Sequence, residues 1–314
     1  MATYDIVILG AGGVGCVVGG LLSAAGWRVQ LVNRHADTAR AVEKNGLRLE
    51  MDAGLLVSHP NAVTTSQIGQ AKFVMCFTKT HQTEAAIRAI IPNLNPDSIL
   101  VTMQNGLGNG QIIRALVNHD VLHGVTMIPA TVLAPGHIRS MGTHNSWIGP
   151  LDRNNDRQNH AAQELADMLT ASGIKTTYHQ DVLPPIWQKA CFNIAMNGVA
   201  ALADASPGLI GQTPTLTNEV HLLADEALLL ATTLGIAVDG DSVHQLIDFA
   251  CREHRFHQPS MLQDIRSQRI TEIDALNGYV VAQATQLGLD VPRCRLIAAL
   301  IHARQTAPEF WAAQ

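Results

Sequence analysis

A glycine motif near the amino terminus sets the strongest limit on how this chain can fold. Gly10, Gly12 and Gly15 give Gly10-Ala11-Gly12-Gly13-Val14-Gly15 the pattern Gly-x-Gly-x-x-Gly. An apolar run at residues 5–9 predicts a strand before the motif, and residues 13–25 predict a helix after it, which is the context that gives the motif meaning. In that context the first glycine permits a tight turn, the second admits a pyrophosphate, and the third lets helix and strand pack closely. The motif predicts a dinucleotide-binding unit, with a glycine-rich turn that holds no ligand as the alternative.

Alternating β-rich and helical segments continue through the first 180 residues, which is typical of a parallel sheet covered by helices. Further strands are predicted at residues 28–32, 73–77, 99–102 and 174–178, and hairpins at 47–51 with 55–59 and at 123–133 with 137–141. Beyond Asp181 the strand signals stop and amphipathic helices follow, among them residues 217–234 and one helix from Ser260 to about residue 287. The expected fold is an α/β N-terminal Rossmann domain, doubly wound with a mostly parallel sheet, followed by an all-α C-terminal domain. The predicted ranges are 1–180 for NADP binding and 181–314 for catalysis and substrate binding.

Composition narrows the class of protein. Hydrophobic residues make up 47% and charged residues 15%, which is a globular composition. A net charge of −5 offers no basic surface for nucleic acid or anionic lipid, so neither partner is expected. The five cysteines are scattered without a Cys-x-x-Cys pair, and the 14 histidines show no metal-ligand spacing, so no disulfide framework and no metal site are expected. The apolar stretch at residues 6–27 is interrupted by glycines and lacks the features of a targeting segment, and a cytoplasmic location is expected.

The end of the second predicted strand bears on the choice of cofactor. NAD enzymes usually place Asp or Glu there to hold the ribose 2′-hydroxyl, whereas an arginine suits the 2′-phosphate of NADP. This chain has Asn33-Arg34 at that position, and the next acidic residue after them is Asp37. The arrangement favours NADPH, and the alternative is that Arg34 is an ordinary surface arginine.

A polar stripe is predicted on the first helix of the second half. Lys189, Asn193 and Asn197 recur every four residues, and each step turns a helix by ~400°, so the three lie within ~80° of one another. Two amides and a lysine on one face would suit a small anion. A polar stripe exposed to solvent is the alternative.

Over essentially its whole length the chain resembles the ketopantoate reductase (2-dehydropantoate 2-reductase) family. The matching blocks are Gly10–Gly15, Arg34, Lys79 in Phe77-Thr-Lys79-Thr, Gln104-Asn105-Gly106-Leu-Gly108, Trp187 through Asn197, Ser260 through Arg266, and Thr271 through Gly278. The last two blocks, with their fixed separation, are far more specific than the glycine motif. The resemblance implies NADPH-dependent reduction of ketopantoate to D-pantoate in the biosynthesis of pantothenate and coenzyme A.

The resemblance also implies a role for each matching residue. Lys189 matches the general acid, and Glu272 matches a carboxylate that orients the reacting groups and contacts the cofactor. The residues implied to contact the cofactor are Gly10, Ala11, Gly12, Gly13, Val14, Gly15, Arg34, Lys79, Asn105, Ala130 and Glu272, and those implied to contact substrate are Asn105, Asn193, Asn197 and Ser260. Two alternatives remain open. Ser260 could simply cap its helix, because Ser260 with Gln263 has capping-box spacing, as has Ser242 with Gln245. Glu272 could be an exposed helix carboxylate.

One position departs from the family pattern. The family commonly has an asparagine near the position of Pro207, where it helps to hold substrate. The departure bears on the exact substrate and not on the type of reaction. Two other functions therefore stay open: a paralogous NAD(P)H-dependent reductase of another branched 2-keto acid, and a non-catalytic sensor that binds NADPH. The expected partner is a small 2-keto acid, and the sequence leaves a homodimer open.

Overall fold

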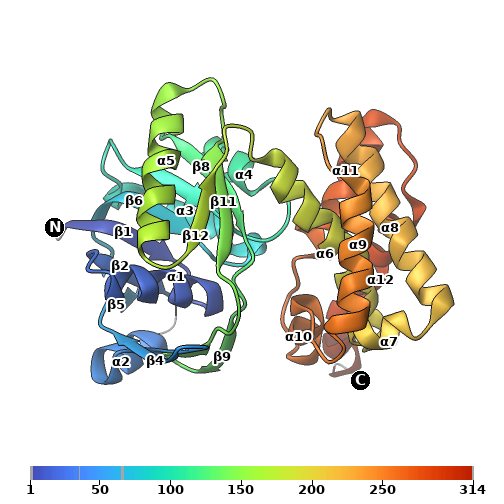
Figure 1. Ribbon diagram of the computed structural model, residues 1–314, viewed down its shortest axis with the longest axis horizontal. Coiled ribbons are helices and arrows are strands. Elements are labelled where there is room, and N and C mark those ends of the chain that lie inside the picture. Colours follow the sequence, from blue (N-terminus) through green and yellow to red (C-terminus); the bar gives the residue numbers. More distant parts are fainter. Residues whose placement is uncertain (1–2, 35, 65–66, 313–314) are drawn as a thin grey trace. The chain divides into compact units, whose positions relative to one another are not determined.

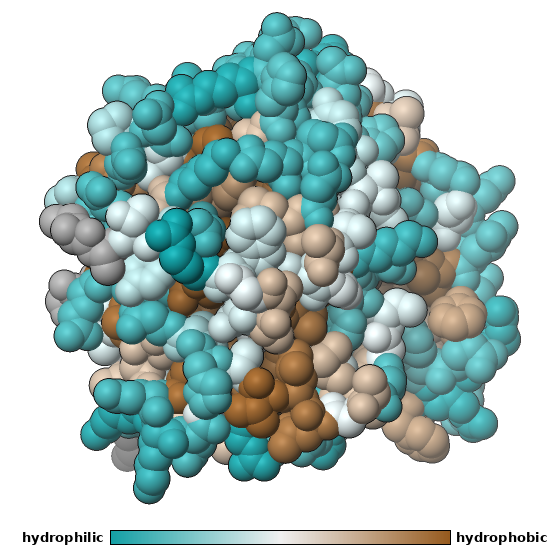
Figure 2. All heavy atoms as spheres, turned by 60° about the vertical axis from the view of Figure 1, so that its left-hand side comes forward, coloured by the Kyte–Doolittle hydropathy of each residue, from teal (hydrophilic) through white to brown (hydrophobic). Residues whose placement is uncertain are grey.

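The computed structural model describes residues 3–34, 36–64 and 67–312. The chain divides into two compact units. Unit 1 holds the residues up to Gln104 together with Asn109–Val182, and unit 2 holds Asn105–Gly108 together with the residues from Leu183 onward. In the described residues no helix is long and apolar enough to cross a membrane. The surface drawn in Figure 2 is largely hydrophilic, with a group of hydrophobic residues near its lower centre.

An eight-stranded sheet forms the centre of unit 1 (Figure 1). Its order is β12-β11-β8-β7-β6-β1-β2-β5, and all neighbours are parallel except β8 and β11. The strands are β1 (Thr3–Leu9), β2 (Val29–Asn33), β5 (Asn61–Thr64), β6 (Gln70–Cys76), β7 (Ile99–Thr102), β8 (Val121–Thr126), β11 (Asn145–Pro150) and β12 (Lys175–Tyr178). The run β5-β2-β1-β6-β7-β8 is the doubly wound order that reverses direction between β1 and β6, which confirms the predicted fold class.

Each face of this sheet has its own apolar core, because side chains alternate along a strand. Ile6 and Ile8 point to the face covered by α1 and α5, whereas Val7 and Leu9 point to the face covered by α3 and α4. The helices of unit 1 are α1 (Gly13–Ala24), α2 (Ala36–Asn45), α3 (Thr83–Ile90), α4 (Asn109–Leu116) and α5 (Asp156–Ala171), with short 3₁₀ turns at Thr80–Gln82 (η2) and Ile91–Asn93 (η3). Helices on both faces leave the carboxyl ends of the strands open for ligands.

A second, four-stranded sheet of order β4-β3-β10-β9 completes unit 1. It consists of β3 (Leu47–Met51), β4 (Gly54–Ser58), β9 (Thr131–Ala134) and β10 (His137–Arg139). The hairpin β3–β4 occurs where it was predicted. The hairpin predicted around residues 134–136 also occurs, as the antiparallel pair β9–β10. The extent of its first strand, 123–133, is wrong, because β8 and β9 belong to different sheets and Pro129, which cannot donate to a ladder, lies between them. The strands β5 and β11 were not predicted.

Unit 2 is helical. Its elements are α6 (Leu183–Ala203), α7 (Pro207–Gly211), α8 (Pro214–Thr233), α9 (Gly240–Glu253), α10 (Ser260–Arg266), the 3₁₀ turn η4 (Ile273–Ala275), α11 (Asn277–Leu287) and α12 (Pro292–Ala312). Helix α6 is buried almost continuously from Ala190 to Ala201 and contributes to the core of the unit. Prolines 184 and 185 lie in its first turn, where the missing amide hydrogens cost little.

Three sequence predictions for unit 2 are wrong. The single helix expected from Ser260 to residue 287 is broken between Arg266 and Ile273, where Gln268 has a positive φ of 53°. Asp239, and not Ser242, caps α9, since its carboxylate accepts from the Ser242 amide. Pro259 occupies the cap position of α10, so Ser260 is the first helical residue and makes no capping hydrogen bond.

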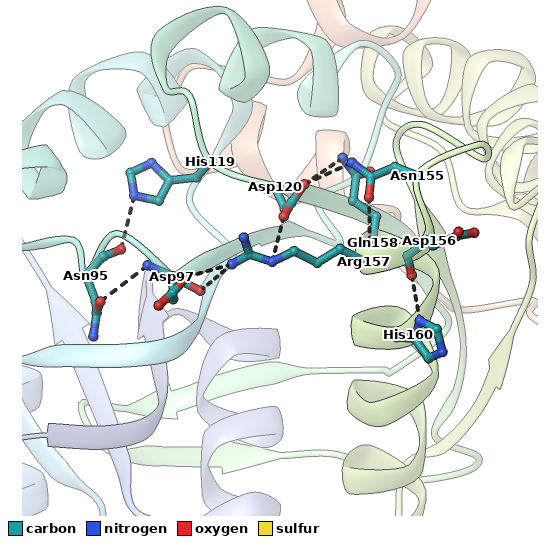
Figure 3. A network of polar contacts seen from close by, with 9 residues as sticks. All are labelled: Asn95, Asp97, His119, Asp120, Asn155, Asp156, Arg157, Gln158 and His160. Atoms are coloured by element: carbon teal, nitrogen blue, oxygen red, sulfur yellow. Dashed lines mark hydrogen bonds and ion pairs between the residues drawn. The ribbon is translucent and has the colours of Figure 1, made fainter.

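Arg157 links carboxylates at the amino-terminal edge of the large sheet (Figure 3). Its Nε lies 3.1 Å from Asp120, whose side chain is 15% exposed, and its Nη2 lies 3.2 Å from Asp97, whose side chain is 86% exposed. Asp120 also accepts from the amides of Asn155 and Gln158 at 3.2 Å each. A cavity of about 570 Å³ adjoins this network, lined in part by Arg28, Lys72 and Arg157, each of them ion-paired with an acidic residue. The cavity lies at the edge opposite to the one where α/β sheets bind ligands.

Asp120→Ala should lower the free energy of unfolding by about 2 kcal/mol or more, because it leaves three donors without their shared carboxylate acceptor. Asp97→Ala is the matched control on the same arginine, and as a loss from an exposed ion pair it should cost less than about 1 kcal/mol. Urea denaturation of both variants checks this. An equal loss of unfolding free energy in the two variants would contradict the importance assigned to Asp120.

Candidate functional site

The turn between β1 and α1 is the first cluster of predicted site residues. Gly10 has a φ of 101°, and a Cβ there would lie 2.6 Å from the amide nitrogen of Thr78. A Cβ at Gly15 would lie 2.2 Å from the carbonyl oxygen of Gly10. Both positions therefore require glycine on backbone grounds alone. Gly12 differs, because a Cβ at this exposed residue would meet nothing within 4 Å.

The amino terminus of α1 is available to a ligand. Gly12 is the cap residue, and no side chain among the described residues caps the helix. The first turn of a helix has amide hydrogens without intrahelical acceptors, and here these belong to Gly13, Val14 and Gly15. Together with the helix dipole they favour a negatively charged group, and the open space at Gly12 leaves room for one. These observations fit a bound pyrophosphate and weigh against a purely structural turn.

Neighbouring loops hold this turn in place. The side-chain amide of Asn33 donates to the carbonyl oxygen of Ala11 at 3.0 Å, and that of Gln104 donates to the carbonyl oxygen of Thr78 at 2.6 Å. Ala130 lies beside the turn, because a Cβ at Gly13 would come within 3.0 Å of the Ala130 Cβ. The sequence analysis missed the anchoring roles of Asn33, Thr78 and Gln104, although all three stand within its motifs.

Two predicted cofactor residues follow strands of the same sheet. Arg34 comes directly after β2 and is exposed. Lys79 follows β6, is half-buried and precedes the 3₁₀ turn η2. Because β2 and β6 flank β1 on either side and are parallel to it, both residues lie at the carboxyl edge of the sheet, as the glycine turn does.

Lys189 is the centre of the second cluster, which lies in unit 2. Its Nζ donates a hydrogen bond to the Asn105 Oδ1 at 2.7 Å. Burial lowers the pKa of the Lys189 ammonium to about 8, and the nearby Glu272 carboxylate partly opposes this shift. Glu272 is only 8% exposed, so the alternative of an exposed helix carboxylate is wrong. A buried ammonium with a pKa near neutrality can donate a proton to a bound ligand.

Local backbone structure brings these three residues together. The break after α10 places Glu272 just before η4 instead of inside a helix. The Leu107 amide donates to the Ala275 carbonyl oxygen at 2.8 Å, and a Cβ at Gly106, whose φ is 85°, would lie 2.6 Å from the Ala275 Cβ. The loop Asn105–Gly108 therefore packs on η4 and belongs to unit 2, which a single boundary near residue 181 did not anticipate.

Asn193 and Asn197 lie on the same helix as Lys189. They are 9% and 5% exposed, so the alternative of a solvated polar stripe does not hold for them. Among the described residues, neither carboxamide has a hydrogen-bond partner, and neither contains a fully inaccessible polar atom. Buried amides without partners are costly unless a ligand or water satisfies them. Ser260 is half-buried at the start of α10, and the capping role offered as its alternative is not observed.

Asn277 is a further polar residue that sequence reasoning did not single out. It is fully buried, and its amide donates to the Ile194 carbonyl oxygen of α6 at 3.1 Å. It thereby links α11 to the helix that carries Lys189, Asn193 and Asn197. Its presence in the quoted block Thr271–Gly278 was the only signal for it in the sequence.

Comparisons with known proteins identify the family. A family model described as "Ketopantoate reductase PanE/ApbA" matches residues 6–153, and one for the C terminal of the same family matches residues 181–305. A 2-dehydropantoate 2-reductase of Streptococcus pyogenes is 30% identical over 304 residues, covering 96% of this chain and 97% of the relative. One from Pyrococcus horikoshii is 29% identical, with coverage of 96% and 97%.

Two solved structures share this fold over nearly the whole chain. A ketopantoate reductase of the PanE/ApbA family from Ralstonia eutropha superposes with a TM-score of 0.89 at 26% identity, covering 97% of this chain and 99% of that one. A ternary structure of D-mandelate dehydrogenase with NADH and anilino(oxo)acetate has a TM-score of 0.90 at 28% identity, covering 96% and 99%.

Replacing Glu272 should change the acidity of Lys189. Glu272→Gln removes the negative charge that opposes the effect of burial, so the Lys189 pKa should fall further below about 8. Asp274→Asn is the control, because this exposed carboxylate pairs with His302 and is expected to leave the Lys189 pKa unchanged. NMR titration of the lysine side chains checks both variants, and an unchanged Lys189 pKa in Glu272→Gln would contradict the assigned interaction.

Proposed function

The chain belongs to the ketopantoate reductase family, and we propose that it reduces ketopantoate (2-dehydropantoate) to D-pantoate with NADPH. The observation that carries the proposal is Lys189, a buried ammonium with a pKa of about 8 that is hydrogen-bonded to Asn105 and lies near Glu272. The proposed setting is pantothenate biosynthesis in the cytoplasm, and the five free cysteines fit a reducing compartment.

The residues of unit 1 fit a dinucleotide. The amides of Gly13, Val14 and Gly15 at the start of α1 would hold the pyrophosphate, and the side chain of Arg34 would hold the 2′-phosphate. Lys79 and Ala130 are the further proposed contacts in this unit, and Asn105 and Glu272 are those proposed in unit 2. When bound, NADPH supplies the hydride that reduces the C2 ketone.

Lys189 acts as the general acid in this proposal. Its Nζ gives a proton to the C2 oxygen as the ketone becomes a hydroxyl, and Asn105 holds the ammonium in position through the 2.7 Å hydrogen bond. The Glu272 charge favours the protonated ammonium, so Lys189 carries its proton below a pH of about 8 despite its burial. A sensor that only binds the nucleotide would need no such buried acid, which favours an enzyme.

Asn193, Asn197 and Ser260 are the proposed substrate residues. Their neutral amide and hydroxyl groups can bind the carboxylate and the terminal hydroxyl of ketopantoate. The two amides have no partners among the described residues and so are available to do this.

A reductase of another 2-keto acid is the second candidate. Its support is the similarity to D-mandelate dehydrogenase, whose ternary structure contains NADH. Pro207 adds to it, because this buried residue begins the short helix α7 and has no side-chain amide to offer a substrate.

Lys189→Ala should lower kcat for keto acid reduction by ~10²–10⁴, the usual effect of losing a general acid. In the unmutated protein kcat should fall as the pH rises through about 8, where Lys189 loses its proton. The control is Lys175→Ala, which removes an exposed lysine of β12. A near-normal kcat in Lys189→Ala, with cofactor binding confirmed, would assign proton donation to another group.

Arg34→Ala should raise the KM for NADPH and leave that for NADH nearly unchanged. An arginine–phosphate contact contributes about 1.5–3 kcal/mol, which is roughly a ten- to 150-fold change. Arg40→Ala is the control, because Arg40 is exposed on α2 and pairs with Asp37. Steady-state kinetics with both cofactors checks this, and equal use of NADPH and NADH by the unmutated protein would refute the proposed preference.

Substrate choice is tested with 2-ketoisovalerate, which keeps the branch of ketopantoate but lacks its hydroxymethyl group. A site that hydrogen-bonds a hydroxyl rejects an analogue without one, so kcat/KM should be lower by at least ~10². The second substrate for comparison is the 2-keto acid whose reduction at C2 gives mandelate. Comparable or higher efficiency on either compound would favour the second candidate over ketopantoate reduction.

A further inference from the structure

Two histidines on neighbouring helices of unit 2 face each other at hydrogen-bond distance. His221 of α8 and His244 of α9 have their Nδ1 atoms 2.7 Å apart, with ring centroids at 4.9 Å. The outer nitrogens meet carboxylates of the opposite helix: the His221 Nε2 lies 3.1 Å from Asp248, and the His244 Nε2 lies 3.0 Å from Asp225. All four side chains are partly exposed, so solvent and ions can reach them.

Helix geometry makes this arrangement symmetric. Each helix carries His and Asp four residues apart, at 221 and 225 on α8 and at 244 and 248 on α9. Residues four apart lie on one helix face, so each helix presents an imidazole and a carboxylate to the other. The two histidines are 23 residues apart in the chain, which is why ligand spacing in the sequence gave no sign of the pair.

The two carboxylates favour one tautomer of each ring. An ionised carboxylate only accepts hydrogen bonds, so each Nε2 facing Asp225 or Asp248 is an N–H donor. A neutral imidazole carries one N–H, and the two Nδ1 atoms would then direct lone pairs at each other across 2.7 Å. A cation between them removes this repulsion. A proton can serve, but two carboxylates carry two negative charges, which a divalent metal ion balances in full.

We propose that His221 and His244 bind a divalent transition-metal ion such as Zn²⁺ through their Nδ1 atoms. Imidazole nitrogen binds such ions at about 2.0–2.1 Å. The two Nδ1 atoms must therefore move from 2.7 Å to about 3.3 Å apart to share one tetrahedral ion. Asp248 and Asp225 orient the rings by accepting from Nε2, as carboxylates commonly do behind metal-bound histidines. No group of three or more His, Cys, Asp or Glu residues in the described part of the chain is placed to hold a metal, so water supplies the remaining ligands.

The test is calorimetric titration of the untagged full-length protein with ZnCl₂ in a buffer that does not bind metal. The unmutated protein should bind one Zn²⁺ per chain at this site. His221→Gln and His244→Gln should each weaken binding by at least about tenfold. Asp248→Asn and Asp225→Asn keep both ligands and should weaken it by about 10- to 100-fold, the usual effect of losing a carboxylate behind a metal-bound histidine.

Two controls separate this site from other histidines of unit 2. His302→Gln removes a histidine that pairs with Asp274 and contacts no second imidazole in the described part of the chain. His254→Gln alters the pair His254–His257, whose ring centroids are 6.1 Å apart. Both variants should keep the affinity of the unmutated protein. Absence of Zn²⁺ binding, or binding that survives His221→Gln but not His254→Gln, would overturn the proposal. Circular dichroism identifies any variant that fails to fold, and the aspartate variants then carry the test.

Discussion

Burial of the Lys189 ammonium is the constraint on which the arrangement of unit 2 depends. Removing a charge from water is costly unless polar groups compensate, and here burial lowers the Lys189 pKa to about 8. The compensation comes from the Asn105 oxygen and from the Glu272 carboxylate. Neither group is near Lys189 in the chain, so the loop Asn105–Gly108 and the turn at η4 must both be held against α6. The Leu107–Ala275 hydrogen bond and the close approach at Gly106 hold the loop on that turn.

The same arrangement gives the cluster its chemical character. A fully solvated lysine is too weak an acid to transfer a proton readily near neutral pH, whereas an isolated buried lysine would lose its proton. Lys189 lies between these limits because burial and the Glu272 charge act in opposite directions. The buried amides of Asn193 and Asn197 share its helix and remain available to a ligand. Membership in a family of keto acid reductases and this balance of charges point to the same kind of reaction.

Sequence reasoning failed where the chain turns without a strong local signal. The break after α10 occurs at Gln268, which adopts a positive φ without being glycine. The apolar residues on either side keep a helical period, so the sequence pattern gives no sign that the helix ends there. The split of residues 123–133 between two sheets had a signal in Pro129, but apolar periodicity alone cannot show to which sheet a segment belongs. Asp239 preceded the predicted cap at Ser242 by three residues and is the better-placed acceptor.

The sequence by itself determined the doubly wound sheet, the glycine turn and the helical second half, because these depend on local backbone freedom and on the period of apolar residues. It also determined which polar side chains stand on one stripe of α6, since helical spacing fixes that. The tertiary structure alone decided that Asn105, Lys189 and Glu272 meet, that the Asn193 and Asn197 amides are buried, and that His221 faces His244. These contacts join residues up to 84 positions apart, as Lys189 and Asn105 are, and the packing of whole elements sets them. No local pattern along the chain encodes them.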